Sequence, residues 1–294
     1  MSIELITADD PEFQLLLSTD ESKFSRRNAL YGPKNIEFYR EIRNVRLQED
    51  LSFLIRQQKQ SLVGVLMKAY ANSDGETEIS FEGLPAVFPQ SGNQSNAARK
   101  LFKTEFVERM NRYDRLVSFS ARAHLSSGTL NVGSQTILSM GGRTEVGLSR
   151  VLDLSLSEPE LRSALSKTVK WSINWGVKHL RIEVYDGTNM SSELMSGFQE
   201  LHLKAAGTKT RSDRSWDIQR EQIEAGEAFL VVGYLADRLV TAALFIVSQK
   251  HCYYGVSASD RELFEKPISH AIVWTAIQHC QAATNVRYFE MGDV

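Results

Sequence analysis

The stretch Gly226–Asp293, GEAFLVVGYLADRLVTAALFIVSQKHCYYGVSASDRELFEKPISHAIVWTAIQHCQAATNVRYFEMGD, decides the fold of this chain. Two apolar runs near its start, Ala228–Tyr234 and Leu239–Ser248, are separated by a short polar break. Such runs on either side of a break predict a β-hairpin. A third run rich in β-forming residues, His251–Val256, follows at once, so three adjacent strands are expected in chain order.

A helix and a last strand complete this stretch. Pro267 opens a helical pattern. Apolar and small residues after it share one helical face, and these are Ile268, Ala271, Ile272, Thr275 and Ala276. The run Val286–Met291 predicts a strand that ends in Gly292-Asp293. A unit of three strands, a helix and a further strand places the start of the helix beside an open cleft, and ligand-binding residues are expected there.

The first half of the chain has the same order of elements in outline. A short helix is expected at Asn35–Ile42, and Ser73-Asp74-Gly75-Glu76 is a strong turn signal. The repeated order of hairpin, third strand, helix and strand is predicted at Leu51–Gln57, Ser61–Tyr70, Thr77–Phe81, Ala97–Arg112 and Leu116–Phe119. We infer a degenerate structural repeat of the unit described above.

The region between these stretches carries helix-boundary signals. Ser157 followed by Glu160 fits a capping box. Gly207 is expected to end a helix over Ser191–Ala206, because glycine readily adopts the left-handed conformation that closes helices. A short helix, Trp216–Ile223, then precedes the stretch that decides the fold.

Composition narrows the class of protein. The 294 residues allow two domains of ordinary size, and 42% hydrophobic residues are enough for a sizeable core. The net charge of −2 and a pI near 6.3 argue against a DNA-binding protein. The two cysteines, Cys252 and Cys280, form neither a disulfide framework nor a metal-binding spacing, which is typical of a reducing compartment.

The chain also has no sign of export. The N-terminal sequence MSIELITADDPEF has neither a basic segment nor an apolar one, so it does not look like a signal peptide. No run approaches the roughly 18 apolar residues that a membrane-spanning helix needs. A cytoplasmic protein without a transmembrane segment is expected.

Several positions of the second half resemble the FemAB-like (Fem-type) transferases, which act in peptidoglycan bridges and envelope polysaccharide clusters. The positions are Phe198-x3-His202, Trp216, Gly226-x-Ala228-Phe229-Leu230, Tyr253-Tyr254-Gly255-x-Ser257-Ala258, Pro267-x2-His270-Ala271-x2-Trp274-x2-Ile277 and Phe289-Glu290-Met291-Gly292. The first half is similar to this family only in outline. The resemblance implies an α+β fold of two tandem GNAT-like (acetyltransferase-fold) domains at 1–150 and 151–294. Each would be a mixed, mostly antiparallel sheet flanked by helices, and the second would hold the site.

The activity that the resemblance implies is transfer of an acyl or aminoacyl group onto an amine of a cell-envelope precursor. The amine attacks a thioester or ester carbonyl directly, so no covalent enzyme intermediate is needed. The site has to hold both reactants, accept a proton from the amine and donate a hydrogen bond to the developing oxyanion. A nucleophilic triad is therefore not expected, and the sequence contains no G-x-S-x-G.

Three residues are the catalytic candidates. His270 lies in the first turn of the expected helix, where the helix dipole disfavours a protonated imidazole and leaves it usable as a base or donor. Glu290 and Asp293 follow at the end of the last strand, where a carboxylate can orient or deprotonate the amine. The family usually has aspartate at the position of Glu290. The alternatives are a histidine hydrogen-bonded at a helix end and ordinary exposed strand-end acids.

Five residues are the substrate-binding candidates. Consecutive strand residues point to opposite faces, so one of Tyr253 and Tyr254 is expected in the core and the other at the cleft. Arg211 and Arg214 suit a clamp on a phosphate or carboxylate, and Trp216 suits stacking on a base or sugar. The alternatives are two aromatics that pack a sheet and a solvated basic loop.

The donor and the acceptor stay open. GNAT-type enzymes cradle the coenzyme A pyrophosphate with an R/Q-x2-G-x-G/A loop, which is missing from Gly255–Ser269 and from Pro89–Asn96. Acyl-CoA and aminoacyl-tRNA both remain candidate co-substrates, with no tightly bound cofactor or metal expected and no cofactor-binding residues assigned. The acceptor would be a nucleotide- or lipid-linked amino sugar or peptide stem. A different reading is a non-catalytic saccharide- or protein-binding member of the same fold.

Overall fold

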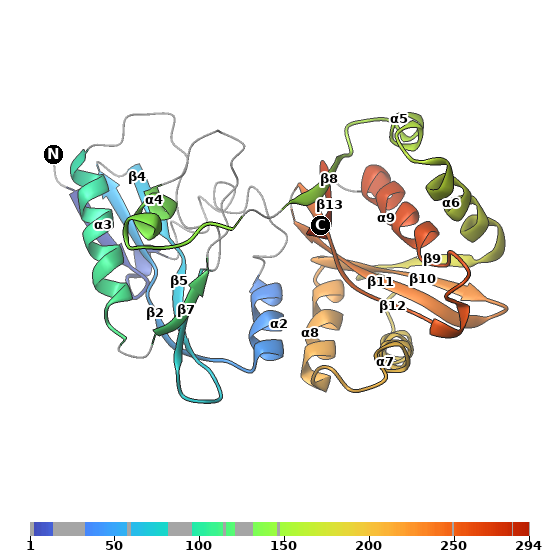
Figure 1. The fold of residues 1–294 in the computed structure, drawn as a ribbon, viewed down its shortest axis with the longest axis horizontal. Helices are drawn as coiled ribbons and strands as arrows, with labels where there is room; N and C mark the ends of the chain where they lie inside the picture. Colours follow the sequence, from blue (N-terminus) through green and yellow to red (C-terminus); the bar gives the residue numbers. More distant parts are fainter. Residues whose placement is uncertain are drawn as a thin grey trace. The chain divides into compact units, whose positions relative to one another are not determined.

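The computed structural model describes residues 3–13, 33–57, 60–81, 96–113, 116–120, 132–145, 148–248, 250–283 and 285–293 (Figure 1). The chain divides into two compact units. Unit 1 comprises Met1–Arg26 and Arg43–Val146, and unit 2 comprises Arg27–Ile42 and Gly147–Val294. Most of the expected loop Pro89–Asn96 lies outside the described residues.

Unit 2 is built on a six-stranded mixed sheet in the order β8-β13-β12-β11-β10-β9. Only β12 and β13 are parallel, because helix α9 (His270–Ala283) connects them as a crossover, and every other pair of neighbours is antiparallel. The strands are β8 (Ser149–Asp153), β9 (Arg181–Tyr185), β10 (Ala228–Leu235), β11 (Arg238–Ser248), β12 (His251–Ser259) and β13 (Tyr288–Asp293).

The hairpin, the third strand, the crossover helix and the last strand expected from the sequence are therefore all present. The tight turn between β10 and β11 places Ala236 and Asp237 at φ 49° and 62°, so both adopt the left-handed region that such a hairpin turn requires. Helix α9 begins at His270 and not at Pro267. Ile268 instead turns its side chain into a cluster with Leu180 and Val240.

Helices cover both faces of this sheet (Figure 1). Helices α5 (Glu158–Ser163), α6 (Lys167–His179) and α9 pack on one face, and α7 (Ser192–Ala206) and α8 (Asp213–Glu224) pack on the other. The predicted boundary signals are confirmed. The Ser157 N–H donates to the Glu160 carboxylate at 2.8 Å, and Gly207 ends α7 at φ 75°.

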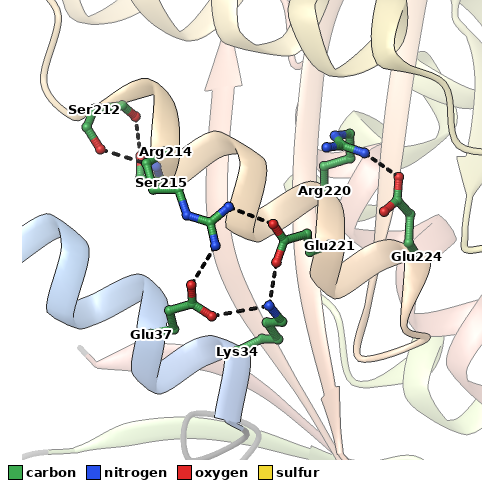
Figure 2. Close-up of polar contacts among 8 residues, drawn as sticks. All are labelled: Lys34, Glu37, Ser212, Arg214, Ser215, Arg220, Glu221 and Glu224. Atoms are coloured by element: carbon green, nitrogen blue, oxygen red, sulfur yellow. Dashed lines mark hydrogen bonds and ion pairs between the residues drawn. The ribbon is translucent and has the colours of Figure 1, made fainter.

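Helix α2 (Pro33–Arg43) confirms the helix expected at Asn35–Ile42, but it belongs to unit 2 although it precedes the strands of unit 1 in sequence. It is joined to α8 by an ion-pair network (Figure 2). Arg214 donates to Glu37 and Glu221 at 2.6 Å each, and Lys34 donates to both of these carboxylates. A buried amide pair lies beside it, where Gln222 Nε2 donates to Asn35 Oδ1 at 3.4 Å.

Unit 1 repeats the same plan. A four-stranded sheet in the order β2-β5-β6-β7 has one parallel pair, β6–β7, and helix α3 connects the two strands of that pair as α9 does in unit 2. A three-stranded sheet has the order β1-β3-β4. The elements are β1 (Ile3–Thr7), β2 (Arg46–Asp50), β3 (Phe53–Gln57), β4 (Gln60–Val65), β5 (Met67–Ala71), β6 (Thr77–Phe81), α3 (Asn96–Met110), β7 (Leu116–Ser120) and α4 (Val132–Ser139).

The core of unit 1 forms where α3 packs on these strands, with the rings of Phe102 and Phe53 5.3 Å apart. The single strand expected at Ser61–Tyr70 is divided into β4 and β5. At the break, the Ser52 hydroxyl accepts from the backbone N–H of Met67 at 3.0 Å. The structure thus has two tandem GNAT-like units of mixed sheet and helices. None of the helices within the described ranges is both long and apolar enough to cross a bilayer.

Candidate active site in unit 2

The parallel strands β12 and β13 separate after a short pairing. They are in register over His251–Tyr253 and Tyr288–Glu290, and β12 then continues to Ser259 paired with β11. Beyond Tyr253, the edge of β12 that faced β13 therefore has no paired strand among the described residues. An open strand edge presents backbone N–H and C=O groups that a ligand can bind.

A β-bulge at Gly255 changes which residues face each side of β12. Tyr254 pairs with Phe245 and Val256 with Leu244, so Gly255 is the extra residue. Tyr254 packs on the α9 side, whereas Val256, two positions on, packs on the α7 side. A Cβ at Gly255 would lie 3.2 Å from the Leu244 carbonyl oxygen, so a larger residue crowds the bulge.

A pocket of about 450 Å³ lies at the carboxyl end of β12. Its walls come from β12, from the 260–269 loop that leads to α9, and from the last turns of α7. The polar and aromatic side chains that line it include His202, Tyr254, Ser257, Ser259, Lys266 and Ser269. The cleft expected beside the start of the crossover helix is thus present as a pocket next to Ser269.

Asp260 fixes the end of β12 at this pocket. Its side chain is 3% exposed, accepts from the Glu262 N–H at 3.1 Å and lies 3.2 Å from Lys204 Nζ and 3.3 Å from Arg238 Nη2. Burial raises the pKa of Asp260, but the Glu262 N–H and the Lys204 ammonium outweigh burial and hold the pKa below its ordinary value. A charged Asp260 therefore ties α7 to the pocket loop.

Glu290 and Tyr253 are directly paired across β13 and β12, at the last pair before the strands part. Phe289 lies in the cluster on the α9 side, so strand alternation turns Glu290 to the α7 side, the side of Tyr253. Glu290 is 7% exposed, and within the described ranges no cation forms an ion pair with it. A buried carboxylate without a cationic partner is a common arrangement at functional sites.

The other two catalytic candidates lie at the same end of the sheet. His270 is the exposed first residue of α9, directly after the pocket-lining Ser269, but it does not itself line the pocket. Asp293 is the last residue of β13, and its side chain lies outside the described residues. The start of α9 and the ends of β12 and β13 meet at one edge, because a crossover helix runs antiparallel to the strands it joins.

The two tyrosine rings lie on opposite faces, as alternation predicts. Tyr254 stacks on Phe245 with ring centroids 5.4 Å apart, and it lines the pocket. Tyr253 packs against the cluster formed by α7 and α8. Both rings are half-buried, so each keeps a core contact and an exposed edge.

Trp216 and Arg211 form one stack inside unit 2. The Trp216 ring is 5% exposed, meets Phe198 and His202 edge-on at 5.2 Å, and carries the Arg211 guanidinium carbon 3.4 Å above its centroid. This ring is covered and has no face for a ligand. Burial lowers the pKa of Arg211 to about 10, and its Nε and Nη2 have no hydrogen-bond partner among the described residues.

Arg214 has a different environment from Arg211. The hydrogen bonds that Arg214 donates to Glu221 and Glu37 raise its pKa, and both carboxylates belong to the network that joins α2 to α8 (Figure 2). The two arginines expected to act as one clamp thus have separate partners. Arg211 is the one whose donors are left without an acceptor in the described part of the chain.

Sequence reasoning missed most of the pocket wall. His202 was not among the candidate site residues, yet it lines the pocket, and burial and the nearby Arg211 lower its pKa. Ser257 and Ser259 are two positions apart on β12, and this spacing places both side chains on one face of the strand. The bulge at Gly255 shifts the register before them, so the sequence alone did not show which face that is. Within the described ranges, no group of three or more His, Cys, Asp and Glu side chains is placed to hold a metal ion.

Comparison with known proteins finds likeness in structure and none in sequence. No protein-family model and no curated protein matches the chain. The crystal structure of FemX superposes with a TM-score of 0.67 at 11% identity, over 100% of this chain and 89% of that one.

Two further structures are similar over nearly the whole chain. A tandem GNAT protein from the clavulanic acid biosynthesis pathway has a TM-score of 0.54 at 15% identity, over 98% of this chain and 89% of that one. The C-terminal domain of a putative lysylphosphatidylglycerol synthetase from Agrobacterium fabrum has a TM-score of 0.55 at 11% identity. This match covers 96% of this chain and 79% of that one. The chain therefore has the FemX-like tandem GNAT fold, with a mixed sheet and a crossover helix in each unit.

Proposed function

We propose that this protein is an N-acyltransferase that moves an acyl or aminoacyl group from a thioester or ester donor to an amine of a cell-envelope precursor. The observation that carries the proposal is the pocket of about 450 Å³ at the carboxyl end of β12, the strand that also carries Tyr253 paired with Glu290. A donor arm bound along the open edge of β12 would end beside this pair. The FemX-like fold supports the same reaction class.

The pocket suits a donor that carries phosphate and an extended arm. Arg261 and Lys266 bring cations to its rim, and Ser257 and Ser259 bring hydroxyl groups to its wall. Phe264 on the pocket loop is 80% exposed and offers a ring on which a nucleotide base can stack. Acyl-CoA and aminoacyl-tRNA share these features, namely an adenosine, phosphate and an activated carbonyl.

The chemical step needs a proton acceptor for the attacking amine. The amine nitrogen forms the new C–N bond, the C–S or C–O bond to the donor breaks, and the leaving thiolate or alkoxide is protonated. We assign the amine proton to the carboxylate of Glu290, with His270 orienting the amine or relaying the proton at the start of α9. Tyr253 lies on the same face of the sheet as Glu290, and its hydroxyl would bind the acceptor.

An anionic group on the acceptor would be held by Arg211. Its guanidinium is fixed on Trp216 and Phe38, and two of its nitrogens have no acceptor among the described residues. The lysylphosphatidylglycerol synthetase among the similar structures is named for a lipid product, which favours a lipid-linked acceptor here. Both cysteines are buried, and neither forms a disulfide within the described ranges, in keeping with a cytoplasmic enzyme.

The test is a transfer assay with purified protein. Acetyl-CoA, longer acyl-CoAs and aminoacyl-tRNAs are offered as donors, with nucleotide-linked amino sugars and peptide stems as acceptors, and products are read by mass. Glu290→Ala and His270→Ala should abolish transfer, whereas Glu200→Ala, on the exposed surface of α7, should not. Full activity in both site variants would remove Glu290 and His270 from the mechanism.

One observation favours a second candidate, a non-catalytic saccharide- or protein-binding protein. The pocket loop from Asp260 to Ser269 contains no glycine, so it lacks the closely approachable backbone amides that usually cradle a pyrophosphate. Thermal-shift measurements separate the two. A rise in Tm with acyl-CoA or nucleotide-linked sugars supports the enzyme. An unchanged Tm with all of these ligands, together with a stable protein complex, supports the binding protein.

A further inference from the structure

The outward face of helix α6 combines lysines with exposed apolar side chains. Trp171 is 58% exposed and Val177 is 60% exposed, although both are large apolar residues. Helical spacing places Trp171 with Lys167 and Lys178 on the side away from the buried Ile173 and Gly176, and Lys170 and Val177 lie along the edge of that side nearer Ile173. We call these five residues, Lys167, Lys170, Trp171, Val177 and Lys178, the α6 face.

The α6 face cannot turn inward to bury its indole. A Cβ at Gly176 would lie 2.4 Å from the Cβ of Ala271 on α9, so the two helices pack at close range and fix the rotation of α6 about its axis. The helix is also capped at its start, where the Ser166 hydroxyl accepts from the Val169 N–H at 3.2 Å. The exposure of Trp171 is therefore a permanent feature of unit 2.

The charge on this face has one sign. Helix α6 contains no acidic residue, and among the described residues no carboxylate forms an ion pair with its three lysines. Lys170 donates to the Ser163 carbonyl at 3.1 Å and keeps its charge. The nearest acids in sequence on either side of α6 are Glu160, which accepts from Ser157, and Glu183, which forms an ion pair with Arg181.

The geometry points to a docking surface for anionic lipid, with Trp171 and Val177 entering the headgroup layer and the three lysines contacting lipid phosphates. An amphipathic helix that lies in the membrane plane has this composition, and tryptophan favours the interface between headgroups and acyl chains. Trp171 and Val177 lie at the two edges of this face with the three lysines between them, and a tryptophan flanked by lysines fits a lipid surface. This inference does not rest on the proposed function, since docking needs neither donor nor acceptor.

Vesicle co-sedimentation with the full chain tests the proposal. The probes are vesicles of phosphatidylcholine alone and vesicles in which about a third of the lipid is phosphatidylglycerol. Binding is expected to the anionic vesicles only, and to fall at high salt because charge screening shortens the range of attraction. Changing Lys167, Lys170 and Lys178 to Gln together should lower the partition coefficient on the order of a hundredfold, and Trp171→Ala roughly tenfold.

A matched variant keeps the test specific to this face. Helix α3 also exposes three cations, Arg99, Lys100 and Lys103, and their joint change to Gln removes the same charge elsewhere. This variant should bind vesicles like the natural sequence, and circular dichroism should show that all variants are folded. Failure of the natural protein to bind anionic vesicles at low salt overturns the proposal. So does equal loss in the α3 variant, or binding of tRNA in place of vesicles through the same lysines.

Discussion

Glu290 is the residue on which the proposed chemistry depends most. It is almost fully buried, paired across strands with Tyr253, and lies where β12 and β13 part. Its position in the last shared register of two diverging strands fixes its backbone at the point where β12 and β13 part. A purely structural glutamate at such a place would be expected to have a cationic partner, and none is found within the described ranges.

The prediction for this residue is a loss in turnover and not in folding. Glu290→Gln keeps the shape of the side chain but cannot accept the amine proton, so kcat should fall by about 10²- to 10⁴-fold with KM little changed. Steady-state kinetics with the donor and acceptor found in the transfer assay measure this. Glu200→Gln, exposed on α7, serves as the control, and an unchanged kcat in Glu290→Gln would assign the proton to another group.

At the scale of elements, the attachment of α2 to α8 joins two helices of unit 2 that lie far apart in the sequence. It depends on Lys34 and Glu37 from one helix meeting Arg214 and Glu221 from the other (Figure 2). Hydrogen bonds from Lys34 and Arg214 lower the pKa of Glu221 to about 2. A carboxylate whose folded pKa is depressed stabilises the fold above its unfolded pKa, and this stabilisation is lost as the pH falls through the folded value.

Glu221→Gln should therefore lower the free energy of unfolding by about 1 kcal/mol at neutral pH. The difference from the natural sequence should shrink below pH of about 4.5 and vanish near pH 2, as Glu221 becomes protonated in both states. Urea unfolding across this range measures it. Glu224→Gln breaks the simple Arg220–Glu224 pair on the same helix and should cost only a few tenths of a kcal/mol. Equal effects of the two changes would mean that the network adds nothing beyond a surface pair.

The crossing of α6 over α9 gives a second prediction at this scale. Gly176→Ala places a methyl group 2.4 Å from the Cβ of Ala271, so it should destabilise unit 2 by roughly 1–3 kcal/mol. At an exposed helix position the same change would stabilise by about 1 kcal/mol. Adding Ala271→Gly should recover part of the loss, and a double-mutant cycle by chemical denaturation measures the coupling. A stabilised Gly176→Ala protein would show that the helices are not in close contact.

At the scale of the whole molecule, the order of elements followed from sequence periodicity. The hairpin before His251, the crossover helix and the parallel last strand were all predictable, because alternation and helical spacing are local signals. The membership of α2 in unit 2 was not, since it depends on contacts between residues far apart in the chain. The tandem repeat could be inferred from element order alone.

The candidate site was predicted less completely than the fold. The placement of the start of α9 at the end of the sheet toward which β12 and β13 run followed from topology. The bulge at Gly255 did not, because a one-residue shift in register reverses side-chain direction without leaving a sequence signal. The burial of Trp216 under Arg211 was equally hidden, since an aromatic and a cation in a polar loop also fit a ligand clamp.

The central claim is that the acyl donor binds at the open end of β12 in unit 2. Hydrogen–deuterium exchange of the whole protein, with and without acyl-CoA or aminoacyl-tRNA, tests it most directly. A bound donor should protect the backbone amides from Tyr254 to Ser269, which span the open strand edge and the pocket loop. Protection confined to unit 1, or no protection by any donor, would contradict it.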